Sequence, residues 1–477
     1  MRGLGACALA MLWGCAGAAG GPSDDRPNIV LILLDNVGQE WFGCYGGEDG
    51  VTPNIDALAR EGVRAENCYT HPVCGPSRVQ LLTGRYPFRT GWTLHHDAAL
   101  YSGGGLDPAR ETVVARVLRD AGYATAVAGK WQVNNLYDEP GVLARHGFDR
   151  HLVWPGSIDR DRIDAARWEA FQDHVRHGRA EELATLNTNI ESRYWDPVLM
   201  RDGRRERHPG RFGPDVLQEF ALDFMRRHRE RPFFLYYPLP LVHGQSFREP
   251  TVETPLNRGR GLSERERFAG MMAYADRLVG ELVETLQTLG LRERTIVVVA
   301  SDNGTEKNLT ARRNGREVRG GLYQLGEAGQ TALLVNAPGR IPGGRTVPLA
   351  DFTDVFPTLC DLAGAPRPAG AILDGRSLAP FLLGRDSAPP REWILNQSHT
   401  RRVVRDRRWK LYSTGELYDV VDDPAETRDL SSAPPPESAA SRGRLQAVLD
   451  SLPDDTALPF PHRSLQAFSL RAAKDLK

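Results

Sequence analysis

The sequence has no excess of charge of either sign, since 61 acidic residues stand against 60 basic ones. A strongly basic chain would indicate nucleic acid or an anionic membrane surface as a partner, and this chain gives no such indication. It also contains no internal repeat and no low-complexity tract. With 477 residues and ordinary proportions of hydrophobic and charged side chains, it predicts a globular protein that buries a large core.

Cysteine is scarce, with 6 residues in the whole chain. Two of them lie in the N-terminal leader, and the others are Cys44, Cys68, Cys74 and Cys360. This number excludes a disulfide-stabilised scaffold in so long a chain. A bridge between Cys44 and Cys68 is conceivable after export, but the sequence cannot pair the cysteines. No group of His and Cys residues has the spacing of a zinc site either.

No apolar run has the length and flanks of a transmembrane helix. The N-terminal apolar stretch, residues 4–19, follows Arg2 and ends in a small-residue motif that resembles a cleavage site. We therefore expect residues 1–20 to be a signal peptide and the mature protein to be exported, either periplasmic or secreted. The sequence Leu-Trp-Gly-Cys also resembles a bacterial lipoprotein site at Cys15. Trp13 is unusual there, so lipidation stays an alternative.

Four apolar runs predict strands that are buried on both faces of a parallel sheet, because they do not alternate with polar residues. They are residues 28–34, 125–128, 232–237 and 295–300. Helical segments separate them, most clearly the helix that begins at Ser263, where Glu266 completes a capping box, and ends at Gly290. This alternation predicts an α/β fold with a large, mostly parallel sheet flanked by helices.

The composition changes near residue 390. Short strands around Trp409 and an amphipathic helix over residues 441–452 predict a smaller C-terminal α+β domain. We expect a catalytic domain at residues 21–390 and this smaller domain at residues 391–477.

Each of the four predicted strands leads into residues with useful chemistry. In an open parallel sheet the carboxyl ends of the strands share one edge, and ligands bind there. The residues are Asp35, Asn36, Lys130, Gln132, His243, Asp302 and Asn303. Any one of them has an ordinary explanation, since Asp and Asn often close strands as turns and a lone His is often structural. Their joint occurrence predicts a single pocket.

Two Asp-Asn pairs at these strand ends, Asp35-Asn36 and Asp302-Asn303, offer only oxygen ligands. Carboxylate and amide oxygens suit a hard cation such as calcium better than they suit zinc. The alternative for either pair alone is an Asx turn.

Cys74 opens the most informative stretch, Cys-Gly-Pro-Ser-Arg-Val-Gln-Leu-Leu-Thr-Gly-Arg. Pro76 suits the first turn of a helix, and Gly84 suits its end. Cys74 is therefore expected at a helix N-terminus, where free N–H groups and the helix dipole favour an anion, with Arg78 one turn further on. A lone cysteine in this position is alternatively an ordinary thiol with a low pKa.

This stretch resembles the signature of the sulfatase family, in which Cys-x-Pro-Ser-Arg is followed by Leu-Thr-Gly-Arg. Other segments resemble the family in the same order along the chain: residues 26–35, 52–56, 122–131, 232–235, 243, 301–304, 356–358, 374–378, 409–411 and 416–419. The nearest resemblance is to formylglycine-dependent, exported bacterial enzymes of the arylsulfatase-like branch. It implies the alkaline-phosphatase-like α/β fold with a small C-terminal domain.

The resemblance implies a sulfuric ester hydrolase in which a maturation enzyme converts Cys74 to formylglycine (3-oxoalanine). One hydroxyl of the hydrated aldehyde, ionised by calcium, would attack sulfur, and inorganic sulfate would be released. The implied ligands of one calcium ion are Asp35, Asn36, Cys74, Asp302 and Asn303. The implied catalytic residues are Cys74, Arg78, Lys130 and His243. The implied substrate contacts are Ser157 and Gln132.

Two positions at the strand ends depart from the family's pattern. Asn36 stands where an Asp is common, which removes one negative charge from the calcium site. Gln132 stands where a His often follows Gly-Lys-Trp, and a neutral amide cannot take a proton as imidazole can. Another base is then needed, and the candidates are His71, His243 and water.

A third departure removes a cation. Many sulfatases have a Lys after a Gly-Gly pair in a later turn, and here Leu322 follows Gly-Gly. Arg316 and Arg319 are candidates to replace it, and the departure favours impaired or altered activity.

Three functions remain in competition. The leading one is a sulfatase acting on a sulfated carbohydrate or another sulfated small molecule, since many exported relatives act on glycans. The second is a phosphonate or phosphate ester hydrolase that uses the same residues. The third is a protein that binds sulfated glycans without turnover, which Gln132 and Leu322 favour. A basic run over residues 201–211 offers a contact for an anionic polymer, although Asp202 and Glu206 interrupt it and favour a solvated surface segment.

Overall fold

The computed structural model describes most of the chain after the predicted leader. The described residues are 25–96, 98, 104–156, 166, 169, 192–244, 251–326, 329–387 and 391–459. The predicted signal peptide and Ser157 lie outside these ranges.

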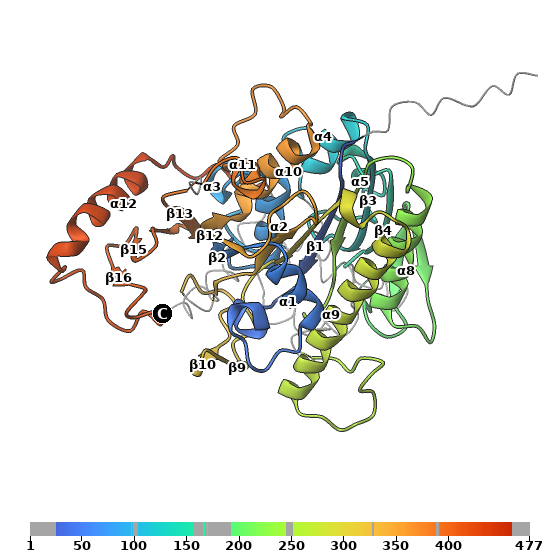
Figure 1. Cartoon of the computed structure of the whole chain (residues 1–477), viewed down its shortest axis with the longest axis horizontal. Coiled ribbons are helices and arrows are strands. Elements are labelled where there is room, and N and C mark those ends of the chain that lie inside the picture. The colour runs from blue at the N-terminus through green and yellow to red at the C-terminus, as the bar shows by residue number, and fades with distance from the viewer. Residues whose placement is uncertain are drawn as a thin grey trace, which may run out of the picture.

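A ten-stranded mixed sheet forms the centre of the molecule (Figure 1). Its strand order is β12-β2-β11-β8-β1-β7-β3-β4-β5-β6. The strands are β1 (Asn28–Leu34), β2 (Val63–Tyr69), β3 (Ala124–Lys130), β4 (Arg150–Trp154), β5 (Val198–Arg201), β6 (Arg204–Arg207), β7 (Phe233–Pro238), β8 (Thr295–Ser301), β11 (Leu333–Asn336) and β12 (Arg345–Asp351). β8, β1, β7, β3 and β4 run parallel to one another, whereas β11, β5 and β6 are antiparallel to their neighbours.

The four predicted strands correspond to β1, β3, β7 and β8, within two residues at each end. β1 shows why the sequence lacks alternation. Ile29, Leu31 and Leu33 pack into a core on one face of the sheet, while the residues between them pack into a second core on the other face. Every residue of β1 is therefore buried, and only a continuous apolar run meets that demand.

Helices cover both faces of this sheet (Figure 1). Hydrophobic residues of α1 (Pro53–Arg60), α8 (Gly213–Arg227) and α9 (Glu264–Thr288) pack on one face. Those of α2 (Cys74–Thr83), α4 (Val114–Asp120), α10 (Val355–Ala363) and α11 (Ala379–Leu382) pack on the other. Of the shorter helices, α5 (Val142–Arg145) adds Val142 and Leu143 to this second core, and α3 (Pro87–Thr90) adds Phe88 to a smaller cluster that includes Trp409. The predicted α/β architecture is confirmed.

The helix α9 matches its prediction closely. Ser263 is its N-cap, and both hydrogen bonds of the capping box with Glu266 are present. Its apolar stripe is buried, and Gly290 takes the left-handed conformation, with φ +66°, directly after the helix.

A second, four-stranded antiparallel sheet forms a separate layer near the C-terminus, at the left of Figure 1. It consists of β13 (Ile394–Ser398), β14 (Arg401–Arg405), β15 (Trp409–Tyr412) and β16 (Leu417–Asp419). Helix α12 (Ala439–Ser451) packs on it through Leu445, which shares a hydrophobic cluster with Trp409 and Leu411. The predicted small α+β unit is thus present, and the boundary at residue 390 stays a prediction.

Two further features complete the described part of the chain. All four cysteines after the leader are free, so the conceivable Cys44–Cys68 bridge is not formed. None of the described helices is both long and apolar enough to cross a membrane.

The basic run predicted as a surface segment is the β5–β6 hairpin at the edge of the large sheet. Arg201 pairs with Glu206 across it, and Asp202 pairs with Arg150 of β4. Glu206 therefore pairs within the run and Asp202 pairs with the neighbouring strand, which agrees with a solvated surface segment.

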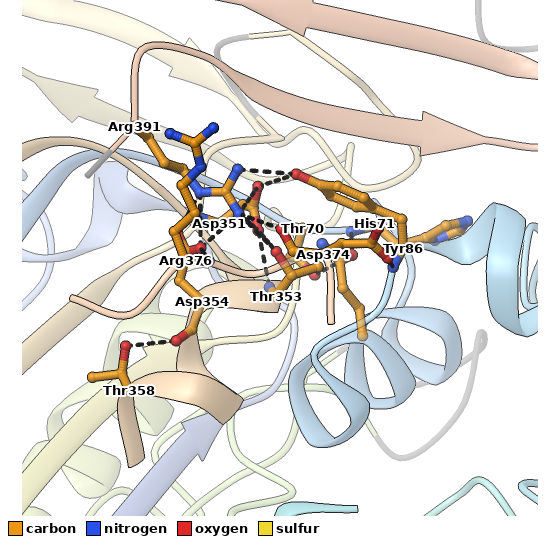
Figure 2. A network of polar contacts seen from close by, with 11 residues as sticks. Thr70, His71, Tyr86, Asp351, Thr353, Asp354, Thr358, Asp374, Arg376 and Arg391 are labelled. Carbon is orange, nitrogen blue, oxygen red and sulfur yellow. Dashed lines mark hydrogen bonds and ion pairs between the residues drawn. The ribbon is translucent and has the colours of Figure 1, made fainter. Parts of the chain in front are cut away.

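A buried polar network around Arg391 ties the start of the C-terminal unit to the large sheet (Figure 2). The Arg391 guanidinium donates to both carboxylate oxygens of Asp354, at 2.6 and 2.7 Å, and lies 3.4 Å from Asp351. The Tyr86 hydroxyl donates to Asp351 at 2.6 Å. Gly375 fits beside this network because a side chain there would lie 1.8 Å from the Thr353 carbonyl oxygen.

We predict that Arg391→Met lowers the free energy of unfolding by about 3 kcal/mol or more, because two carboxylates stay buried without their cation. Burial already raises the pKa of Asp351 to about 6, above its unfolded value, so the fold favours the protonated carboxyl. The loss in the variant should therefore shrink from about pH 8 to about pH 5, as protonation removes the unpaired charge. Urea denaturation at both pH values measures this.

The matched control is Arg367→Met, since Arg367 also forms a two-pronged pair, with Asp361, but at the exposed surface. Its loss should stay within about 1 kcal/mol. Equal losses in the two variants would contradict a special role for the buried network.

Candidate active site

The predicted strand-end residues meet at one edge of the sheet. Asp35 follows β1, Asp302 follows β8 and Lys130 ends β3, and these strands lie in the order β8-β1-β7-β3. Potential ligand atoms of Asp35, Cys74 and Asp302 all lie within 4.8 Å of one another, and the three residues are buried. His243, beyond β7, stands beside the same edge. The loop after β7 is bonded to it, because Val242 N–H donates to the Asp35 carbonyl oxygen.

Two cations are paired with the two carboxylates. Lys130 Nζ lies 2.6 Å from Asp35 Oδ2. Arg78 donates to Asp302 Oδ2 through Nη2 at 2.8 Å and through Nε at 3.1 Å, and its Nη2 lies 3.4 Å from Asp35. Arg78 also donates to the Lys130 carbonyl oxygen at 2.7 Å. The four side chains form one buried cluster without net charge.

The two carboxylates are electrostatically unequal. Burial would raise the pKa of Asp35, but the charges of Lys130 and Arg78 hold this pKa well below its usual range. Burial and the charge of Asp35 raise the pKa of Asp302. The difference follows from position, because Asp35 lies nearest to Lys130.

Several oxygens in this cluster suit a hard cation. Asp35 Oδ1 and Asn303 Oδ1 are buried and accept no hydrogen bond from the described residues. Asn36 Oδ1 faces Asn303 Nδ2 at 2.6 Å, while Asn36 Nδ2 donates to Glu306 Oε1 at 2.9 Å. The predicted residues therefore converge, and their donor set of carboxylate and amide oxygens fits a divalent cation such as calcium.

Cys74 is the first residue of α2, as predicted, with Val73 as N-cap and Gly84 as the left-handed C-cap at φ +67°. Burial raises the pKa of its thiol to about 11, although the nearby Lys130 opposes this. A reactive thiolate needs a lowered pKa. The direction of this shift does not favour the alternative of an ordinary low-pKa thiol.

The backbone is strained where it enters the cluster. Asn36 and Gln132 both have left-handed φ, at +57° and +68°. Gly129, with φ +136°, precedes Lys130, and any side chain there would lie 1.9 Å from the Pro238 carbonyl oxygen. Such strain costs about 1–3 kcal/mol per residue and collects at functional sites, where it directs side chains.

The sequence analysis named His71 as a candidate base, and Arg316 and Arg319 as candidates to replace the missing cation. His71 is not available as a base, because Nδ1 accepts from Val73 N–H and Nε2 bonds to the Thr93 carbonyl oxygen. Leu322 is buried, and its N–H donates to the Thr305 carbonyl oxygen close to Asp302. Arg319 is exposed and donates to the Lys307 carbonyl oxygen. Position 322 therefore carries an apolar side chain. Arg319, at the end of β10 (Arg316–Arg319), directs its guanidinium to a backbone carbonyl group instead.

One residue of this region escaped the sequence analysis. Arg193 is buried, stacks over the Trp154 ring at 4.4 Å and approaches His243 Nδ1 at 3.1 Å. The sequence around Arg193 carries no motif. Its link to the site is visible only in the structure, where Trp154 pairs with Lys130 across neighbouring strands. Gln132 is buried after β3, and Ser157 lies outside the described residues.

Comparison with known proteins agrees with this geometry. The family model described as Sulfatase matches residues 27–365. Arylsulfatase A of Homo sapiens is 34% identical over 86% of this chain and 80% of its own length. Steryl-sulfatase of Mus musculus is 31% identical over 80% and 68%. N-acetylgalactosamine-6-O-sulfatase of Bacteroides thetaiotaomicron is 28% identical over 90% and 94%.

Solved structures share the fold. The crystal structure of Ps i-CgsB superposes with a TM-score of 0.74 at 24% identity, covering 95% of this chain and all of that one. The PsFucS1 sulfatase from Pseudoalteromonas sp. gives a TM-score of 0.67 at 22% identity, over 90% and 92%. These likenesses establish the architecture and the strand order that brings the cluster together.

We predict that Arg78→Lys lowers kcat/KM on a sulfate ester by about 10²-fold or more, because one ammonium cannot reproduce the fork to Asp302 and the bond to the Lys130 carbonyl. Steady-state kinetics with circular dichroism for the fold would measure this. Arg119→Lys is the control, since Arg119 donates to a backbone carbonyl, that of Ala144, at a site on α4 away from the cluster. Unchanged activity in Arg78→Lys would remove Arg78 from the site.

Proposed function

This chain belongs to the sulfatase family and is a sulfuric ester hydrolase, and we propose that it hydrolyses sulfated carbohydrates with a formylglycine at position 74 and one calcium ion. The observation that carries the proposal is the buried convergence of Asp35, Cys74 and Asp302 with two cations. Family membership is consistent with a metal and a modified cysteine, and the identity of both is part of the proposal.

The charge balance of the cluster supports an anionic substrate. Asp35 and Asp302 offset Arg78 and Lys130, so a bound divalent cation would leave an excess positive charge beside Cys74. The N-terminus of α2 adds its free N–H groups and helix dipole at the same place. A sulfate ester brings the negative charge that such a site requires.

The residues that would hold calcium are Asp35, Asn36, Cys74, Asp302 and Asn303. The unpartnered oxygens of Asp35 and Asn303 are the observation that supports them. A bound calcium ion supplies Lewis acidity at the position of Cys74. Asn36 is neutral, and its Nδ2 donates to the carboxylate of Glu306 at 2.9 Å.

Cys74 would be converted to formylglycine, whose hydrated aldehyde supplies a nucleophile that the thiol with its raised pKa cannot supply. Arg78 and Lys130 would bind the sulfate oxygens, and His243 would donate to the ester oxygen that leaves. Gln132 and Ser157 would contact the substrate. Conversion requires a maturation enzyme as a partner.

The carbohydrate substrate is proposed from the relative named N-acetylgalactosamine-6-O-sulfatase, which covers nearly the whole chain. The steryl-sulfatase relative points to a different, apolar substrate. Comparing the turnover of N-acetylgalactosamine 6-sulfate with that of a steryl sulfate therefore distinguishes these two substrate classes.

We also propose that the protein is exported and is secreted or periplasmic. The predicted signal peptide supports this proposal.

A binding protein without turnover is the second candidate, because a buried leucine, Leu322, stands where many family members have a lysine. Leu322→Lys tests it. An inactive wild type that gains hydrolysis in this variant would favour the binding function.

The mass of the tryptic peptide covering residues 65–78, from protein isolated in its native source, tests the modification. After alkylation, Cys68 should carry the label and position 74 should be an unlabelled aldehyde, so Cys68 is the internal control. The same preparation should hydrolyse an aryl sulfate faster than the matched aryl phosphate, and Cys74→Ala should abolish turnover. Two labelled cysteines would contradict formylglycine chemistry, and faster phosphate turnover would contradict the substrate assignment.

We predict that Glu306→Gln weakens calcium binding by about 10-fold or more, as loss of a partner behind a metal ligand does. The reason is that the acceptor behind Asn36 Nδ2 loses its negative charge and becomes a neutral, weaker acceptor, so it holds the Asn36 amide less firmly. The readout is the rise of the melting temperature with calcium concentration, which requires no turnover. Glu317→Gln on exposed β10 is the control, and an unchanged calcium dependence in Glu306→Gln would refute the role.

A further inference from the structure

A polar cavity lies at the junction between the large sheet and the C-terminal sheet. Its volume is about 210 Å³. The large sheet contributes residues of β2, and Gln330 shortly before β11. β9 (Thr310–Arg313) contributes Arg313, and the C-terminal unit contributes Arg405, the last residue of β14, and the loop after β16. Distant parts of the chain therefore share this cavity.

Two arginine side chains line the cavity, and neither forms an ion pair with a described residue. Arg405 is buried, with 4% of its surface exposed, and donates to Asn67 Oδ1 at 3.1 Å and to two backbone carbonyl oxygens. Arg313 is half-buried and donates to Gln39 Oε1 at 2.9 Å and to one backbone carbonyl oxygen. These bonds leave further N–H donors on both guanidinium groups.

The acidic residues that line the same cavity do not neutralise these arginines. Glu426 pairs with Lys410, whose Nζ lies 2.7 Å from it. Glu66 is exposed, and its carboxylate accepts a hydrogen bond from Thr346 Oγ1 at 2.9 Å. Burial removes the water that solvates a cation, so buried charges are normally paired with an opposite charge. The cavity therefore has an excess of positive charge, to which an anion would be the natural partner.

Tyr69 adds a further donor to this cavity. It is buried, and its hydroxyl oxygen accepts from Gln330 Nε2 at 3.2 Å, which leaves its own proton to be donated. Arg405 and Lys410 both lie over its ring, 5.8 and 5.2 Å from the ring centroid. The planar N–H groups of arginine match the oxygens of a sulfate or a carboxylate group.

The cavity lies at the same edge of the large sheet as the cluster around Cys74. Tyr69 ends β2, which runs in the same direction as β8 because β11 is antiparallel to both. Gln39, which accepts from Arg313, belongs to the segment after β1 that begins with Asp35. Because β2 stands three strands from β1, about 14 Å separates the ends of these strands. A single sugar is too short to cover this distance, whereas an oligosaccharide can cover it.

We propose that Arg313 and Arg405 form an oxyanion-binding site, and that its ligand is a second sulfate or carboxylate group of an oligosaccharide whose sulfate ester lies at Cys74. The oxyanion site is argued from the cavity alone, and the assignment of its ligand to the substrate rests on the proposed function. A free inorganic anion has the same chemistry, so the experiments separate these two sources.

The kinetic test compares two substrates of different length. One is 4-nitrophenyl sulfate, which has a single anionic group, and the other is a sulfated tetrasaccharide with a terminal N-acetylgalactosamine 6-sulfate. We expect Arg313→Gln to raise KM for the tetrasaccharide about 10-fold, because a charge-assisted hydrogen bond is lost, and to leave kcat little changed. Both constants for the aryl sulfate should stay within about twofold, since this ester does not reach the cavity.

Arg405→Gln repeats the test without touching the bond to Gln39, with circular dichroism for the fold. Arg340→Gln is the matched control, because it removes the same charge from an exposed arginine that donates to a backbone carbonyl oxygen, that of Asp25. Equal changes on both substrates in the Arg313 and Arg405 variants would overturn the substrate assignment.

Glu66→Gln should act in the opposite direction. It removes a negative charge that repels an anion in the cavity, while a glutamine can still accept from Thr346. We expect KM for the tetrasaccharide to fall a few-fold, with the aryl sulfate unaffected. An increase of this KM would contradict binding of an anion beside Glu66.

A binding measurement that requires no turnover uses sodium sulfate as the probe. Millimolar sulfate should raise the melting temperature of the wild type and of Arg340→Gln equally, and that of Arg313→Gln less. Binding of sulfate at Cys74 and its general salt effect are common to all three proteins, so the difference reports on the cavity. An equal rise in Arg313→Gln would overturn the oxyanion site.

The two measurements together identify the source of the anion. A smaller rise in Arg313→Gln with an unchanged KM for the tetrasaccharide would assign the site to a free inorganic anion and overturn its role in substrate binding. A wild type that hydrolyses neither ester would count against the proposed function, and the melting temperatures would still decide whether the cavity binds an oxyanion.

Discussion

The pairing of two buried cations with two buried carboxylates is the constraint on which the rest of the site depends. A charge buried without a partner costs several kcal/mol. Loss of any one member of the Asp35–Lys130 and Arg78–Asp302 pairs would therefore leave an unpaired buried charge. The parallel order β8-β1-β7-β3 supplies the match, since each strand delivers its polar end to the same edge. The apolar strands and the two helical layers hold these ends in place, and the N-terminus of α2 closes the cluster with Cys74.

The sequence predicts the parts of this arrangement that are set locally. Apolar runs reveal strands buried on both faces, the Ser263 capping box marks α9, and Pro76 with Gly84 brackets α2. It also predicts that the strand ends share one edge, but it does not predict which loop residues pack against that edge. Arg193 and His243 are separated by 50 residues, and they meet because the described segment before β5 packs against the loop after β7. His71 fails as a base for the same reason, because its nitrogens are used by backbone groups that the sequence cannot identify.

The departures from the family pattern have different physical meanings. At position 36, where an Asp is common in the family, the carboxylate of Glu306 lies beside the Asn36 amide and accepts a hydrogen bond from it. At position 322 nothing comparable occurs among the described neighbours, and Leu322 stays apolar and buried. Under the proposed calcium site, Glu306 thus places a carboxylate beside the neutral Asn36, whereas position 322 offers only an apolar side chain.

The burial of Cys74 sets an order on the biogenesis of the protein. Its side chain is about one-twentieth exposed, at 5%, under the ends of three strands that come from widely separated parts of the chain. An enzyme that modified it would find no access once β8 had joined β1, and β8 is synthesised more than 200 residues after Cys74. Under the proposed conversion of Cys74 to formylglycine, the modification would therefore have to precede closure of the sheet. A chain that folded first would keep an unmodified cysteine at position 74.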